Sequence, residues 1–121
     1  MTTSEITRIL MDKGLARLGD AYVNLVYSLA LTEIEGQPTG AKVSDRMLAE
    51  AARKSGLRRL LPKRTRRDDV ADAVEALLVC AWRSNLMTAE EAKDILKANQ
   101  DLQESFSDLI KAAAKRIQVP L

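Results

Sequence analysis

Residues 65–82 read TRRDDVADAVEALLVCAW. From Ala73 to Trp82 this segment is apolar on every helical face, with one charged interruption at Glu75. A helix that is apolar all round is normally buried. Asp72 lies three residues before Glu75, so the two carboxylates are neighbours on a helix. Because a carboxylate is almost never fully buried without a partner or a metal, we expect a central helix, residues 66–83, whose acids meet a basic group or a cation.

The segment Leu15–Leu31 forms the second helix that we expect to be buried. It reads LARLGDAYVNLVYSLAL, and from Leu18 onward Asp20 is its only ionisable residue apart from two tyrosines. If the two apolar helices pack side by side, Asp20 converges with Asp72 and Glu75. A site built only of carboxylate oxygens suits Mg²⁺ or Mn²⁺.

Composition predicts an all-α fold. The 121 residues are 46% hydrophobic and 30% charged, with only 3% aromatic residues. This is typical of a globular helical protein, and the length suits a single domain, residues 1–121. We therefore expect a compact bundle of five or six helices, in which the other helices span residues 5–11, 45–54, 88–98 and 102–117. The expected N-caps are Ser4, Ser44 and Thr88, and Met47, Cys80 and Trp82 are expected in the core.

Several classes of function are excluded by residues that the chain lacks. It has no histidine, which excludes imidazole metal sites and histidine-based acid–base or triad chemistry. The single cysteine, Cys80, cannot form an intrachain disulfide, which suits a reducing cytosol. The N-terminus lacks the layout of a signal peptide, and Leu18–Leu31 is too short to span a bilayer. We expect a cytoplasmic protein with no membrane partner.

Positive charge is concentrated in residues 53–67. The net charge is only +2, yet this strip holds eight Lys and Arg residues and no acid. Such a strip is most often a solvated face. Beside a cation held by carboxylates, however, it has the charge that phosphodiester hydrolysis needs, since Lys and Arg bind the nucleic-acid backbone.

Structural explanations of the three acids remain open at this stage. Asp20 follows Gly19 and can cap a helix, or it can pair with Arg17 on the surface. The two acids of the later helix can bond Arg66, Arg67 or another basic side chain in a purely structural network, because the spacing D-x-x-E is common.

Two motifs together resemble the ribonuclease III endonuclease domain. Residues 18–21, Leu-Gly-Asp-Ala, resemble the signature helix of that family, and residues 71–78, ADAVEALL, resemble its second motif, A-D-x-x-E-A-L-I. Residues 47–52 are similar to the helix that lies between the two motifs. The order and spacing fit over residues 12–97.

The resemblance implies the site and the activity. Asp20, Asp72 and Glu75 correspond to metal-coordinating catalytic positions, and Glu50 corresponds to an acidic position near the active-site valley that is a further metal candidate. The implied activity is hydrolysis of double-stranded RNA that depends on Mg²⁺ or Mn²⁺ and leaves 5′-phosphate and 3′-hydroxyl ends. The implied assembly is a homodimer whose two sites line one groove.

The chain also departs from the family signature E-x-x-E-F-L-G-D. Its residues 13–20 read KGLARLGD, so Lys13 and Ala16 stand in place of two glutamates, and Arg17 replaces an aromatic residue at the expected dimer contact. The chain looks most similar to the single-domain Mini-ribonuclease III proteins. We expect no separate RNA-binding domain, so the nuclease domain itself is expected to contact the RNA backbone. The candidates for these contacts are Arg58, Arg59, Lys63, Arg64, Arg66 and Arg67.

Two other functions remain as alternatives. The first is a non-catalytic ribonuclease III-like RNA-binding dimer within a ribonucleoprotein, which the loss of two acids supports. The second is a helical protein–protein adaptor or a DNA-binding regulator, with residues 88–98 and 102–117 as its binding pair. The adaptor leaves the three acids unexplained.

Overall fold

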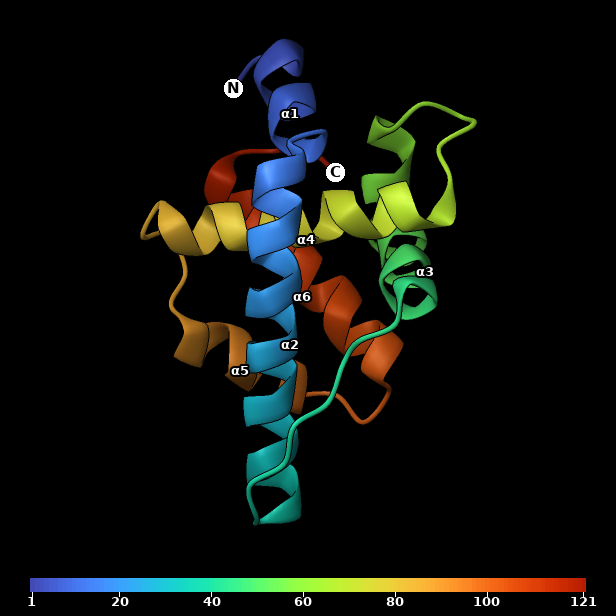
Figure 1. Ribbon diagram of the computed structural model, residues 1–121. Helices are drawn as coiled ribbons and strands as arrows, with labels where there is room; N and C mark the ends of the chain where they lie inside the picture. Colours follow the sequence, from blue (N-terminus) through green and yellow to red (C-terminus); the bar gives the residue numbers. More distant parts are fainter.

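The computed structural model describes all 121 residues and contains α-helices, one 3₁₀ helix and no strand, which confirms the all-α prediction (Figure 1). No helix is both long enough and apolar enough to cross a bilayer. In chain order, the elements are α1 (Thr3–Leu10), α2 (Lys13–Glu35), α3 (Asp45–Ser55), η1 (Leu57–Leu60), α4 (Arg67–Arg83), α5 (Ala89–Lys97) and α6 (Leu102–Ile117).

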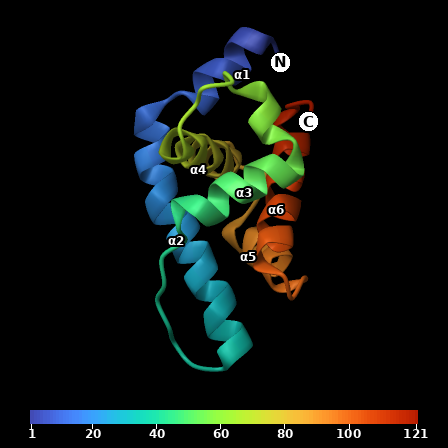
Figure 2. The same cartoon turned by 90° about the vertical axis from the view of Figure 1, so that its right-hand side faces the viewer.

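Helix α4 is the centre of the molecule, as its apolar sequence predicts. From Val70 to Ala81 nearly every residue is buried, including Glu75. In Figure 2 α4 is viewed almost along its axis, with α2, α3 and α6 arranged around it. Since α4 meets other helices on every side, it has no solvent-facing stripe along this stretch.

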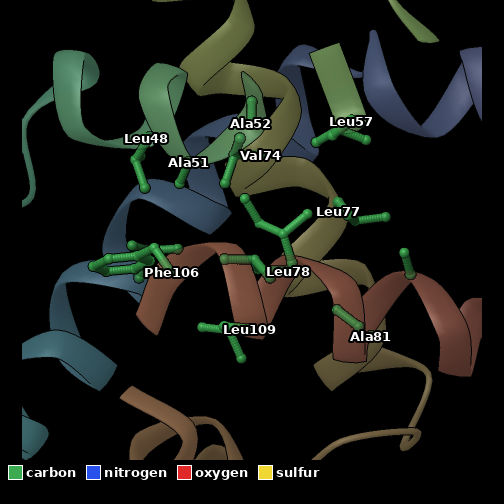
Figure 3. Packing of buried hydrophobic residues seen from close by; sticks show 14 of the residues in the cluster. Leu48, Ala51, Ala52, Leu57, Val74, Leu77, Leu78, Ala81, Phe106 and Leu109 are labelled. Carbon is green, nitrogen blue, oxygen red and sulfur yellow. The ribbon is translucent and has the colours of Figure 1, made fainter. Parts of the chain in front are cut away.

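The core forms where α4 meets α3 and α6. Leu77 of α4 and Phe106 of α6 are fully buried, and Leu48 of α3 is 1% exposed. Figure 3 shows these side chains together between the three helices. This packing fixes the direction of α4 and therefore the face that it presents to α2.

Helix α2 crosses α4 at close range, and the two helices share the most extensive contact in the molecule (Figure 1). A Cβ atom on Gly19 would lie 2.2 Å from the carbonyl oxygen of Glu75, so only glycine fits at this crossing. The crossing brings Asp20, the next residue of α2, to the part of α4 that carries Glu75.

Most helix ends follow the caps expected from the sequence. Ser44 caps α3, and Thr88 caps α5 in a capping box with Glu91. At the N-terminus the prediction was wrong, because Thr2 rather than Ser4 caps α1, in a capping box with Glu5. The second helix is also longer than predicted and begins at Lys13, since Asp12 caps it.

The end of α2 and one aromatic residue differ from expectation. Helix α2 continues to Glu35 and ends at Gly36, whose φ of 77° provides the left-handed termination. Trp82 is 43% exposed, so its placement in the core was wrong. It stacks on Tyr22 of α2 with ring centroids 5.5 Å apart, which covers only one side of the indole.

Candidate functional site

The three carboxylates singled out from the sequence line one pocket between α2 and α4. Asp20 comes from α2, and Asp72 and Glu75 come from adjacent turns of α4. Lys13 and Arg17 of α2 line the same pocket. The site therefore combines an acidic cluster with two basic side chains, which the two helices bring together from distant parts of the sequence.

Glu75 is the buried member of the cluster, with 5% of its surface exposed. Burial, together with a hydrogen bond to Asp20 and repulsion from Asp20, Asp72 and Asp45, raises the pKa of Glu75 from 4.5 to about 8. At neutral pH the metal-free protein therefore holds Glu75 largely protonated. A carboxyl group in this state gives up its proton readily when a cation arrives.

Asp72 is held by an ion pair with Lys13, a basic residue that the sequence did not single out as its partner. Lys13 Nζ lies 3.0 Å from Asp72 Oδ2 and 2.8 Å from Asp69 Oδ1. These bonds raise the pKa of Lys13, and the ammonium lowers the pKa of Asp69. Arg66 lies 3.7 Å from Asp68 instead, so the basic partner of Asp72 is neither Arg66 nor Arg67 but another basic side chain, Lys13.

Asp20 is the most accessible of the three acids. It lies inside α2, so the idea that it caps a helix is wrong. No ion pair joins it to Arg17, although both line the pocket; its Oδ1 accepts a hydrogen bond of 3.3 Å from Asn24. Asp20 thus remains exposed at the rim of the pocket, where it can meet a ligand.

The donors suit a hard cation, although their present rotamers do not form a finished metal site. Every candidate ligand is a carboxylate, the donor type that Mg²⁺ and Mn²⁺ prefer. As the side chains lie, no group of three or more acidic or thiol side chains is close enough to hold one ion. Asp20 already hydrogen-bonds to Glu75, whereas Lys13 holds Asp72, so Asp72 has to leave Lys13 to join the other two acids around a cation.

Asp45, the first residue of α3, is an acidic neighbour of the pocket that no feature of the sequence singles out. Its pKa is raised by burial and by repulsion from Asp72, Asp68 and Asp20, whereas Arg67 lowers it. These effects place Asp45 within electrostatic reach of the pocket. Only the packing of α3 against α4 brings it there.

Glu50, the fourth metal candidate, lies outside the acidic pocket. Its carboxylate forms an ion pair with Arg53, one turn along α3, and both residues line a separate hollow. The arginine lowers the pKa of Glu50, which therefore stays ionised. The structure brings Asp20, Asp72 and Glu75 into one pocket but does not bring Glu50 to them.

The candidate RNA contacts divide into two groups. Arg58 and Arg67 line the hollow that contains Glu50. The other four, which are exposed, are Arg59, Lys63, Arg64 and Arg66. Only Arg66 of the six pairs with an acid, at 3.7 Å from Asp68. The strip therefore keeps most of its positive charge available.

Comparison with known proteins identifies the family to which the chain belongs. A family model described as Ribonuclease III matches residues 13–119. The chain belongs to the ribonuclease III family. The match includes all of α2 and α4 and therefore every residue of the acidic pocket. A search of curated proteins gives no match.

Membership confirms the resemblance drawn from the two motifs. Ribonuclease III proteins are RNA-processing endoribonucleases that act on double-stranded RNA and generally use a divalent metal. Within this family, the acidic pocket and the basic strip are the features of this chain on which a functional proposal depends.

Proposed function

We propose that this protein is an endoribonuclease that hydrolyses phosphodiester bonds of double-stranded or structured RNA with the help of Mg²⁺ or Mn²⁺. The observation that carries the proposal is the convergence of Asp20, Asp72 and Glu75 on one pocket of a chain that belongs to the ribonuclease III family. A structural role alone gives no reason to bury an acid such as Glu75 without a basic partner.

In this proposal Asp20, Asp72 and Glu75 hold the cation. When bound, such a cation supplies positive charge that polarises the phosphodiester and makes a bound water more acidic. Glu75 contributes a preorganised ligand, because its buried position on α4 fixes its direction. Asp20 and Asp72 close on the cation from the rim, and Lys13 must release Asp72 for this to happen.

Lys13 has two roles in this account. In the metal-free protein it neutralises Asp69 and Asp72 and so limits repulsion around the pocket. Once displaced, its ammonium lies at the mouth of the same pocket, where a phosphate of the substrate would approach the carboxylates. A lysine binds phosphate as a mobile point charge.

Two exposed apolar side chains of α2 support a homodimer, because a second copy of the chain would bury them. Leu18 and Leu25 are 43% and 55% exposed, and their spacing of seven residues places them on one helical face. A second copy of the chain would cover this face and double the basic strip. Sedimentation velocity of the wild type and of Leu25→Glu tests this, since only the wild type should sediment as a dimer.

The second candidate is a non-catalytic RNA-binding member of the family. The ion pair between Lys13 and Asp72 favours it, because a lysine that occupies an acidic site can replace the cation instead of awaiting it. The adaptor has less support, since the apolar face of α6, with Phe106 and Leu109, packs into the core of the same chain.

Cleavage of an end-labelled RNA duplex at several concentrations of Mg²⁺ or Mn²⁺ separates these functions. The endonuclease should produce metal-dependent cuts with 5′-phosphate and 3′-hydroxyl ends. Duplex binding without cleavage at any metal concentration would establish the non-catalytic function. If the protein neither binds nor cleaves, both RNA-based functions are wrong. We place the protein in the cytoplasm, in keeping with its single cysteine.

A further inference from the structure

A second hollow, distinct from the acidic pocket, lies where α3 meets the start of α4. It has a volume of about 380 Å³ and is open to solvent. Four arginines line it: Arg46 and Arg53 of α3, Arg58 of η1 and Arg67 of α4. The three elements, which are separate in the sequence, thus bring four arginines to the lining of one depression.

The hollow has an excess of positive charge that the protein itself does not neutralise. Glu50 is its only acid and is committed to Arg53. Arg46, Arg58 and Arg67 form no ion pair with any carboxylate of the chain. Guanidinium groups left without acids but gathered around one space form a binding site for an oxyanion.

One of these arginines is fixed in place. Arg58 donates hydrogen bonds to the carbonyl oxygens of Pro62 at 3.0 Å and Lys63 at 2.8 Å, with a longer contact of 3.4 Å to Leu61. Backbone carbonyls hold the guanidinium but leave its charge in place. An arginine ordered in advance loses less conformational entropy when it binds a ligand.

The hollow adjoins the acidic pocket. Arg67 and Val70 of α4 line the hollow, and Asp72 and Glu75, further along the same helix, line the acidic pocket. The first turns of α4 therefore connect the two sites. A polyanion that reaches the acidic pocket passes over positive charge beside it.

We propose that this arginine hollow is a subsite for a phosphodiester group of the RNA backbone, next to the phosphodiester that is cleaved. The inference rests on the proposed RNA substrate and adds a specific binding position to it. Glu50 is then a positioning residue that orients Arg53, which explains why it lies away from the metal candidates.

The test compares two double variants that each remove two positive charges. Arg46→Ala with Arg67→Ala removes two cations of the hollow. Lys111→Ala with Lys115→Ala removes two exposed, unpaired cations of α6 and serves as the control. Binding of a labelled RNA duplex is measured without divalent cations over a range of salt concentrations, after circular dichroism has shown that both variants are folded.

We expect the hollow variant to bind the duplex about tenfold more weakly or worse, because two charge-assisted contacts are lost. The slope of log K against log salt should fall by about 1 to 2, and the control should keep the affinity and slope of the wild type. Equal losses in both variants, or no loss in either, would overturn the subsite.

Two further measurements identify the occupant and the role of Glu50. Inorganic phosphate should compete with the duplex only at millimolar concentrations; tight phosphate binding lost in the hollow variant would instead make this a site for free phosphate. Glu50→Gln should leave Mn²⁺ binding by calorimetry unchanged. A loss of Mn²⁺ binding would move Glu50 to the metal site and contradict the inference.

The same variants distinguish this inference from the proposed function. If the wild type cleaves, the hollow variant should show a raised KM and a kcat near that of the wild type. If the wild type binds the duplex but never cleaves it, the proposed catalysis fails while the binding comparison still decides the subsite.

Discussion

Gly19 of α2 lies directly against the backbone of Glu75 in α4. A Cβ atom at Gly19 would come within 2.2 Å of the Glu75 carbonyl oxygen and within 2.9 Å of the Glu75 Cβ atom. The contact lies between two backbones, so a rotamer change cannot relieve it. The same glycine therefore permits the close crossing of α2 and α4 and sets the position of Asp20 relative to Glu75.

Gly19→Ala should destabilise the protein, because the added methyl group forces α2 and α4 apart. Overpacking of this kind typically costs about 1–3 kcal/mol in the free energy of unfolding, which urea denaturation measures. Gly40→Ala is the control, since nothing lies within 4 Å of a Cβ atom there. Equal stabilities of the two variants would show that the helices do not meet as described.

The stability of the metal-free protein should depend on the protonation of Glu75. Its pKa is about 8 in the folded protein and 4.5 when unperturbed, so between these values the folded state binds more protons than the unfolded state. This contribution to stability is complete below pH 4.5 and is lost as the pH rises through 8. In Glu75→Gln the loss between pH 6 and 9 should be smaller, as measured by urea denaturation. An identical pH profile in the variant would contradict the raised pKa.

Lys13→Met should tighten the binding of Mn²⁺. The substitution frees Asp72 from its ion pair at 3.0 Å and removes a positive charge from the mouth of the pocket, so the dissociation constant should fall a few-fold. The thermal stability of the metal-free protein should change little, because exposed ion pairs contribute little.

Calorimetry with Mn²⁺ measures this effect, with Lys42→Met as the control because Lys42 is exposed and pairs with no acid. Weaker Mn²⁺ binding in Lys13→Met than in the control would mean that Lys13 orders the ligands instead of competing for them.

The sequence predicted the fold best where a single segment determines the outcome. The apolar run of α4 required a buried helix, and the caps at Ser44 and Thr88 were local signals that no distant contact overrides. Thr2 and Ser4 are both good caps near the N-terminus, and only the capping box with Glu5 distinguishes them. It is harder to predict from the sequence which of two suitable residues caps a helix than to predict that a helix forms there.

The sequence predicted the three acids of the candidate site but not the residues that surround them. Asp20, Asp72 and Glu75 stood out because each interrupts an apolar segment. Lys13 and Asp72 are 59 residues apart, and they meet only because α2 begins beside the first turns of α4. The arginine hollow likewise depends on how α3 approaches α4, since Arg53 belongs to the basic strip but Arg46 lies outside it and has no feature in the sequence that sets it apart from other surface arginines.

The most direct test of the account compares three proteins in the cleavage of one labelled RNA duplex with Mg²⁺ or Mn²⁺. They are the wild type, Glu75→Gln and the control Glu35→Gln, which changes an exposed glutamate with no ion-pair partner. We predict metal-dependent cleavage by the wild type and the control, and a rate lower by about 10²-fold or more in Glu75→Gln, since a metal ligand is worth several kcal/mol to the transition state. Equal cleavage by all three proteins would show that the buried carboxylate of α4 is not part of the catalytic site.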